Sequence, residues 1–247
     1  MTTFCVADIH GNFKALKQCL ERSNFDYKKD KLICLGDTCD GFPDVKECFD
    51  ELLKIKHLVY ILGNHDEWAL EWYDRDKMYY GNPYVKPESL WTSQGGKATL
   101  MSYGWTGYHG DEYKEMDEAH VKLLKSAVYY YIEGKNIFTH GGILETKPVE
   151  ETHKDVFLWD RDIFARAWNV AHYNPKFKIQ HWDSIFIGHT STQNYSNELK
   201  PLFLCNVINL DTGAGWSGKL TIMDVDSKEY WQSDLAQELY PDAKGRR

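Results

Sequence analysis

The first third of the chain switches between two spacings of apolar residues. Three short apolar runs, at 3–7, 31–35 and 57–62, are typical of buried strands in a parallel sheet. Between them, at 12–22 and 44–55, apolar residues recur every three or four positions, which predicts amphipathic helices. This order predicts a β-α-β-α-β unit, whose crossovers we expect to be right-handed.

The rest of the chain predicts a more mixed arrangement. We expect a helix from about His65, another over 116–131 and a strand at 136–139. The pattern at 147–182 is irregular and partly helical. The final third contains predicted strands at 184–187, 202–210, 218–225 and 228–232. Strands that follow an α/β half predict a second sheet packed on the first, within a single domain spanning 1–247.

The stretch at about 78–110 interrupts this pattern. It is rich in glycine, proline and aromatic residues, which predicts a loop-rich insertion with short helical pieces over one end of the sheet. Its aromatic side chains could stack on a nucleotide base, or they could form a small satellite core, which is the commoner arrangement. They belong to Tyr79, Tyr80, Tyr84, Trp91, Tyr103, Trp105 and Tyr108.

Composition and charge narrow the class of protein. A chain of 247 residues with 43% hydrophobic residues is expected to fold around a sizeable core. The net charge of −8 disfavours binding to long nucleic acids or membrane surfaces, and the basic cluster at 244–247 is expected to be solvated. We expect no membrane span or signal peptide. The six cysteines include no Cys-x-x-Cys pair, which favours free thiols in a reducing cytoplasm.

Metal-binding types of side chain gather where the predicted strands end. Because strand ends in an open α/β sheet converge on one edge, we expect these side chains to meet there. A lone histidine after a strand is more often structural, but five glycine-flanked segments together favour a site for two metal ions. The segments are Asp8-Ile9-His10-Gly11, Gly36-Asp37-Thr38-Cys39-Asp40, Gly63-Asn64-His65-Asp66, His140-Gly141-Gly142 and Gly188-His189-Thr190.

The residue types indicate which ions could bind. Carboxylate, imidazole and amide oxygen without thiolate favour Mn²⁺, Fe, Zn²⁺ or Mg²⁺. Asp8 and His10 lie on the same side of an extended strand end and could bind one ion, and Asp37 could bridge two. The second site could be completed by Asn64, His140 and His189. Two such ions stabilise the attacking and leaving oxygens in phosphoester hydrolysis, so the pattern predicts a hydrolase.

A general acid is expected beside this site. His65 follows Asn64 directly, so it cannot easily bind the same ion, but it could face the leaving group. A nearby carboxylate would keep it protonated, and Asp40 is the candidate partner. Asp40 could equally be an ordinary carboxylate of a turn.

These segments resemble those of the calcineurin-like metallophosphoesterases. Their order is similar to that in the phosphoprotein phosphatases, and within these to a small bacterial and phage branch that includes a phage serine/threonine phosphatase and diadenosine tetraphosphatases. The segment Trp159-Asp160-Arg161 resembles the branch's Trp-x-Arg segment, whose arginine binds phosphate. Residues 209–214 and 218–220 resemble its C-terminal strand pair.

The resemblance implies an αββα sandwich with a dimetal site at the carboxyl ends of the strands, commonly holding Mn²⁺. The first ion would be bound by Asp8, His10 and Asp37. The second would be bound by Asp37, Asn64, His140 and His189. The general acid would be His65, oriented by Asp40, and the phosphate would be bound by Arg161 and Asn64.

One departure from the family pattern concerns the substrate. The family's Gly-Asp-x-Val-Asp-Arg-Gly is here Gly36-Asp37-Thr38-Cys39-Asp40-Gly41-Phe42, so Gly41 replaces an arginine that binds phosphate. Arg161 is then the only phosphate-binding arginine that the motifs identify. The change from glutamate to Asp66 in Gly-Asn-His-Glu is milder.

We therefore expect a dimetal phosphatase that hydrolyses phosphomonoesters, such as phosphoserine or phosphothreonine in proteins. The alternative is a nucleotide-directed phosphohydrolase or a phosphodiesterase, with a dinucleoside polyphosphate or a cyclic or other diester as substrate. A scaffold that has lost catalysis is a third interpretation. Its ligand positions should have eroded, whereas here all of them are filled.

Overall fold

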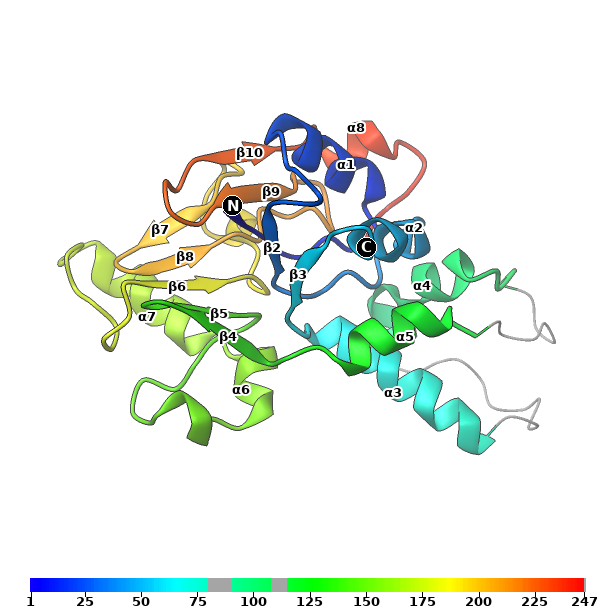
Figure 1. The fold of residues 1–247 in the computed structure, drawn as a ribbon, viewed down its shortest axis with the longest axis horizontal. Helices are drawn as coiled ribbons and strands as arrows, with labels where there is room; N and C mark the ends of the chain where they lie inside the picture. Colours follow the sequence, from blue (N-terminus) through cyan, green and yellow to red (C-terminus); the bar gives the residue numbers. More distant parts are fainter. Residues whose placement is uncertain (80–89, 108–114, 247) are drawn as a thin grey trace.

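Two five-stranded sheets form the centre of the structure, a computed structural model that describes residues 1–79, 90–107 and 115–246 (Figure 1). The first sheet has the order β10 (Tyr230–Gln232), β9 (Thr221–Asp224), β1 (Thr3–Val6), β2 (Lys31–Cys34) and β3 (His57–Tyr60). The second has the order β4 (Tyr130–Glu133), β5 (Asn136–Thr139), β6 (Ser184–Ile187), β8 (Val207–Asn209) and β7 (Leu202–Leu204). Each sheet contains three neighbouring parallel strands, β1-β2-β3 in the first and β5-β6-β8 in the second.

The two sheets pack face to face. Successive side chains of a strand point to opposite sides, so each strand contributes residues both to the core between the sheets and to the core under the helices. In β1, Cys5 lies in the core between the sheets, whereas Phe4 and Val6 lie in the core under the helices. The same alternation places Phe186 of β6 between the sheets and Ile185 on the outer side. The core between the sheets consists of Cys5, Ala7, Ile33, Leu35, Ile61, Phe138, Phe186, Ile208, Leu210, Met223 and Val225.

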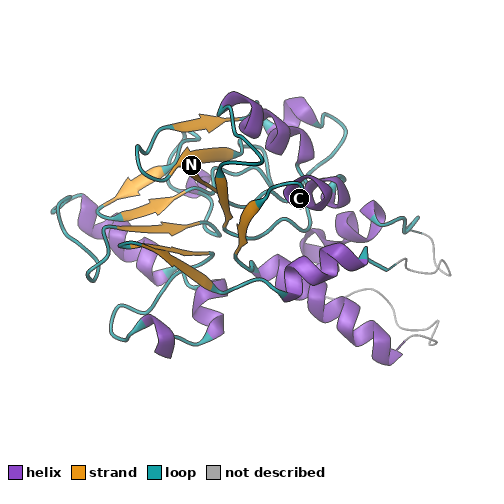
Figure 2. Cartoon of the chain, in the orientation of Figure 1, coloured by secondary structure: helices purple, strands orange, loops and turns teal. Residues whose placement is uncertain are grey.

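Helices cover the outer faces of both sheets, which gives the expected αββα order (Figure 2). The first sheet is covered by α1 (Phe13–Arg22) and α2 (Val45–Leu52), with α8 (Ala236–Leu239) against α1. The second is covered by α6 (Lys154–Trp159) and α7 (Asp162–Ala171). The N-cap of α1 is Asn12, whose side chain accepts a hydrogen bond from the Ala15 N–H and donates one to the Ala214 carbonyl. This residue therefore ties α1 to the loop that follows β8.

A third group of helices lies beyond the strand ends (Figure 1). It contains α3 (Asn64–Tyr79), a π-helical turn at Thr92–Gly96, α4 (Lys97–Ser102) and α5 (Glu118–Lys125). In the described part of the insertion, Trp91, Leu100 and Tyr103 are buried in the main core under the first sheet's helices, rather than in a separate satellite core. The side chains of Tyr79, Tyr80, Tyr84 and Tyr108 lie outside the described residues. One domain with an insertion stays a prediction.

Two elements differ from the sequence-based prediction. The helix predicted over 116–131 ends at Lys125, because the residues after it pair with β5 as the antiparallel strand β4. The two-residue loop of this hairpin begins at Gly134, with φ 61°. The strand predicted over 202–210 is a hairpin of β7 and β8, because the chain reverses at Cys205, with φ 58°.

Two further features concern the described helices and the cysteines. None of its described helices combines the length and the apolar character needed to cross a bilayer. All six cysteines are unpaired, and five of them are buried.

Candidate metal centre

The predicted metal ligands converge at the carboxyl ends of the strands of both sheets. In the first sheet, Asp8 follows β1 and Asp37 follows β2, while Asn64 begins α3 just after β3. In the second sheet, His140 follows β5 and His189 follows β6. The two sheets meet here directly, because the His189 N–H donates to the Asp8 carboxylate, at 3.0 Å from Oδ2.

Asp37 lies in the middle of the cluster. Ligand atoms of Asp8, His10 and Asp37 all lie within 4.8 Å of one another. Asp37 Oδ2 is 3.6 Å from His10 Nε2 and 3.4 Å from His140 Nε2. His140 Nε2 is in turn 2.9 Å from Asn64 Oδ1. One carboxylate thus faces both groups of predicted ligands, the geometry that a bridging ligand requires, although its role stays a prediction.

The histidine rings present lone pairs to this cluster. His10 Nδ1 lies 2.9 Å from the Cys39 carbonyl and His140 Nδ1 lies 2.7 Å from the Leu35 carbonyl, so each ring donates its proton from Nδ1. Each Nε2 is then an acceptor aimed at the centre, the orientation typical of metal-binding histidines. His189 Nε2 is buried and has no hydrogen-bond partner among the described residues.

Charge in the cluster also favours cations. Burial, followed by repulsion from Asp211 and Asp37, raises the pKa of Asp8 well above its usual value, and burial also raises the pKa of Asp37. Burial lowers the pKa of His10, and that of His140 to about 4, which favours the neutral imidazole that binds metal ions. Several carboxylates and neutral imidazoles fit divalent cations such as Mn²⁺, Fe, Zn²⁺ or Mg²⁺ without selecting one of them.

The backbone around the cluster is strained, and glycines give it room. A left-handed backbone costs of order 1–3 kcal/mol at a residue other than glycine, and such residues concentrate at functional sites. A Cβ at Gly63 would collide with the Asp37 carboxylate, and a Cβ at Gly188 would collide with that of Asp8. The glycines in the sequence segments are thus explained by close approach. The predicted ligands with positive φ are Asp8 (54°), His10 (50°), Asp37 (53°) and His189 (63°).

Asp66 holds the loop that carries Asp37. Its buried carboxylate accepts five hydrogen bonds, four of them from backbone N–H groups. Burial and the neighbouring Asp37 raise the pKa of Asp66 to about 6, and the N–H donors oppose this shift. Asp66 Oδ1 accepts from the N–H groups of Thr38 and Cys39, and Asp66 Oδ2 accepts from those of Asp37 and Gly63 and from the Tyr60 hydroxyl. The sequence pattern gave Asp66 no role.

His65 and Asp40 form a buried pair beside the cluster. His65 Nδ1 is 2.5 Å from Asp40 Oδ2, as the predicted acid and its orienting partner require. The insertion holds Asp40, because the Trp91 indole N–H and the Thr99 hydroxyl both donate to its carboxylate. Burial lowers the pKa of His65 to about 4 and raises that of Asp40 to about 7. Burial therefore opposes the positive charge that the sequence predicts on His65.

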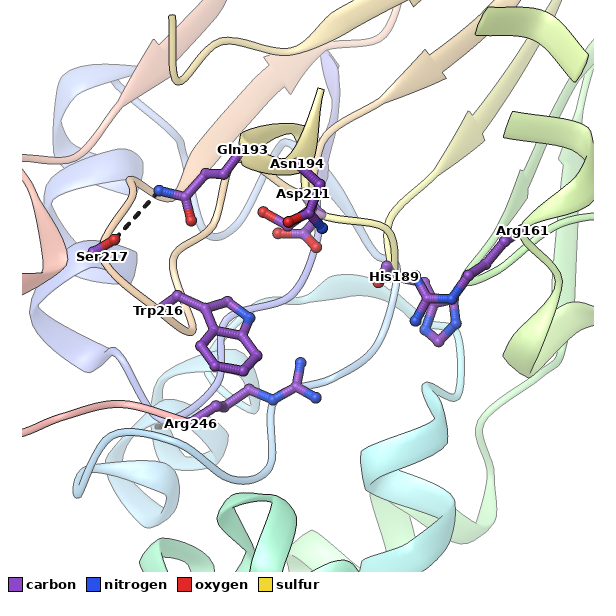
Figure 3. Close-up of a pocket in the computed structure, with 9 residues that line it drawn as sticks. Arg161, His189, Gln193, Asn194, Asp211, Trp216, Ser217 and Arg246 are labelled. Atoms are coloured by element: carbon purple, nitrogen blue, oxygen red, sulfur yellow. Dashed lines mark hydrogen bonds between the residues drawn. The ribbon is translucent and has the colours of Figure 1, made fainter. Parts of the chain in front are cut away.

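A pocket of about 320 Å³ opens beside the cluster (Figure 3). Arg161 lines one side, where its Nη1 donates to the Thr190 hydroxyl at 2.9 Å and to the His189 carbonyl at 3.3 Å. Arg246 enters from a different side, so the basic cluster expected to be solvated places a guanidinium in the pocket. The pocket is lined by Arg161, His189, Ser191, Gln193, Asn194, Asp211, Trp216, Ser217 and Arg246.

Of these residues the sequence gave a role only to Arg161 and His189, and three of the others, Asp211, Trp216 and Arg246, add charge or an aromatic ring to the pocket. Burial raises the pKa of Asp211 to about 6, and its carboxylate lies close enough to Asp8 to repel it. It belongs to a segment that the family resemblance singled out without a role. Trp216 and Arg246 belong to no motif, and no local sequence signal could have placed them beside residues so distant in the chain.

Comparison with known proteins identifies the family. The model of the calcineurin-like phosphoesterases matches residues 1–201. The chain belongs to this family. Its members' phosphoesterase chemistry and dimetal site agree with the carboxylate and histidine cluster described above.

Two curated relatives of this phosphoesterase differ in named activity. A symmetrical bis(5'-nucleosyl)-tetraphosphatase of Pseudomonas putida is 25% identical and is aligned over 96% of this chain and 94% of its own length. Serine/threonine-protein phosphatase 1 of Salmonella typhimurium is 25% identical over 88% of each chain. A crystal structure of a candidate diadenosine tetraphosphatase superposes with a TM-score of 0.62 at 15% identity, covering 93% of this chain and 91% of that one. This last likeness supports the fold alone.

Proposed function

We propose that this phosphoesterase hydrolyses nucleotide polyphosphates, with dinucleoside tetraphosphates as the leading substrate class. The observation that carries the proposal is the pocket beside the cluster, which combines Arg161, Arg246 and the indole of Trp216. Guanidinium groups suit a polyanionic phosphate chain, and an aromatic ring suits a nucleobase. The alternative function expected from the sequence thereby becomes the first choice.

The relatives support the same choice. The Pseudomonas relative named as a symmetrical tetraphosphatase aligns over nearly all of this chain. The Salmonella relative, which is named as a protein phosphatase, keeps the phosphoserine or phosphothreonine phosphatase expected from the sequence as a second candidate. The two candidates share the metal chemistry and differ in what the pocket must hold next to the reacting phosphate.

We assign the ligand roles as the sequence predicted them. The first ion would be held by Asp8, His10 and Asp37, and the second by Asp37, Asn64, His140 and His189. When bound, the two ions would activate a water molecule and stabilise charge on the phosphate. Hydrolysis in the middle of the tetraphosphate would add one water and release two nucleoside diphosphates. Manganese is the expected metal, although the donor set suits several divalent ions.

The remaining roles belong to residues that contact the substrate. Arg161 would bind a phosphate oxygen, together with Asn64. His65 would give a proton to the leaving phosphate, since Asp40 occupies Nδ1 and leaves Nε2 to face the substrate. Asp40 is in this scheme a positioning residue, itself held by the insertion.

A substrate panel tests the proposal. The Mn²⁺-loaded protein would be assayed with diadenosine tetraphosphate, a phosphoserine peptide, p-nitrophenyl phosphate and bis-p-nitrophenyl phosphate, with products resolved by chromatography. We expect the highest kcat/KM on diadenosine tetraphosphate, with ADP as the only nucleotide product. A higher kcat/KM on the phosphopeptide would replace this function with the protein phosphatase, and a preference for the bis ester would favour a phosphodiesterase.

Trp216 provides a sharper test within the same assay. Stacking of a base on an aromatic ring contributes about 1–3 kcal/mol, so Trp216→Ala should raise KM for diadenosine tetraphosphate about 10- to 100-fold. The KM for p-nitrophenyl phosphate, which has no base, should change much less. Equal changes for both substrates would remove the argument for a nucleotide.

A further inference from the structure

The segment 241–246 returns to the metal cluster from α8. The Arg246 N–H donates to the Gly215 carbonyl at 2.9 Å, which fixes the segment against the loop that follows β8. Gly245 makes this approach possible, with φ 61°, because a Cβ there would meet the Gly215 carbonyl and lie 3.0 Å from the Phe42 ring. Backbone contacts thus place the Arg246 side chain in the pocket.

The guanidinium of Arg246 is only partly satisfied where it lies. Its carbon is 5.0 Å from the centre of the Trp216 ring, and Nη1 is 3.2 Å from His10 Nε2. Its Nε is buried and has no hydrogen-bond partner among the described residues. Arg246 is half-buried, and no carboxylate of the described residues lies within ion-pair distance of it, although its charge opposes the rise in the pKa of Asp8 and Asp211. An anion in the pocket would satisfy these donors.

Gly41 and Arg246 occupy neighbouring space. A Cβ built at Gly41 would lie 3.2 Å from Arg246 Cγ, which is tighter than ordinary contact. The position where the family pattern has an arginine thus lacks a side chain, and the stem of Arg246 fills the space beside it. Across the pocket stands Arg161, so two guanidinium groups face one anion site from different elements (Figure 3).

We propose that Arg246 is a substrate-binding residue, which binds the phosphate together with Arg161 and substitutes for the side chain that Gly41 lacks. The inference rests on the proposed phosphoester hydrolysis but not on the identity of the nucleotide. A cation bound by His10 Nε2 would repel the guanidinium, so Arg246 would turn from that nitrogen toward the substrate oxygens.

Binding of inorganic phosphate tests this role without turnover. Arg246→Ala, Arg246→Lys, Arg161→Ala and the matched control Lys244→Ala would be compared as Mn²⁺-loaded proteins by calorimetry with orthophosphate. Lys244 is exposed, and its replacement by alanine removes one positive charge from the same segment. We expect Arg246→Ala to weaken phosphate binding about 10- to 100-fold, the range for hydrogen bonds to a charged group, with Arg246→Lys in between and Lys244→Ala within about twofold.

Two further measurements make the result decisive. Metal content and melting temperature should match the wild type in all four variants, and kcat/KM on p-nitrophenyl phosphate should fall in parallel with phosphate affinity. The inference is overturned if Arg246→Ala behaves like Lys244→Ala, or if it binds metal more tightly and gains activity, because the guanidinium would then compete with the ion. Failure to hydrolyse diadenosine tetraphosphate would refute the proposed nucleotide substrate alone, since orthophosphate carries no nucleoside.

Discussion

Asp66→Asn should be the most informative change outside the predicted ligands. The substitution replaces one carboxylate oxygen by an amide nitrogen, which cannot accept hydrogen bonds. Whichever way the amide turns, it faces two backbone N–H donors, either those of Thr38 and Cys39 or those of Asp37 and Gly63. Each buried donor without an acceptor costs about 1–3 kcal/mol, so the loss of stability should be about 2–6 kcal/mol.

The assay is thermal melting combined with metal analysis, at pH 8, where Asp66 is ionised because its pKa of about 6 lies well below. For a chain of this size the melting temperature should fall by roughly 5–20 °C. Metal content should also fall, since the Asp37 backbone N–H loses its acceptor. Asp183→Asn, the same chemical change in an exposed ion pair with Lys178, should leave both nearly unchanged. If Asp66→Asn kept its melting temperature and its metal, the carboxylate would not organise this loop.

Three other variants give separate predictions. Asp37→Asn should abolish activity and bound metal together, because one carboxylate faces both groups of ligands; full metal occupancy on elemental analysis would contradict the bridging role. His65→Ala should lower kcat about 10²–10⁴-fold with metal retained, and less for p-nitrophenyl phosphate than for an alkyl phosphate, whose poorer leaving group needs the proton; equal losses would count against a general acid. Gly41→Ala should lower the melting temperature more than Gly107→Ala does. The φ angle is 85° at both, but a Cβ at Gly41 lies 3.1 Å from the His10 carbonyl oxygen, whereas one at Gly107 meets none of the described residues within 4 Å. Equal melting temperatures would mean that backbone strain alone matters there, and Gly41→Arg would suffer the same strain.

The candidate cluster was largely predictable because its signals are local. Each predicted ligand follows a strand and all but Asp8 adjoin a glycine, and the structure explains both features. The strands carry the ligands to one edge. Gly63 leaves room for the Asp37 carboxylate from the neighbouring strand, and Gly188 leaves room for the Asp8 carboxylate from the other sheet. The periodicity of the core failed at Cys205, where no glycine or proline marks the reversal, and over 126–131, where apolar residues at helical spacing lead into the strand β4.

Residues that act through distant contacts could not be predicted in this way. Arg246 is a basic residue in a short polar segment, and only the folded chain brings it to His10, 236 positions away. Trp91 and Thr99 likewise look like core residues of the insertion, although both donate to Asp40. Composition suggests their burial, but the hydrogen bonds depend on tertiary packing.

The contact between the two sheets also sets when the centre can be completed during synthesis. The His189 N–H that binds the Asp8 carboxylate lies 181 positions further along the chain. At ribosomal rates of roughly 5–20 residues per second, His189 is made roughly 10–40 s after Asp8. A cation captured in that interval would lack the predicted donor His189, and for most of it also His140. The finished protein, rather than the nascent chain, therefore selects its metal pair.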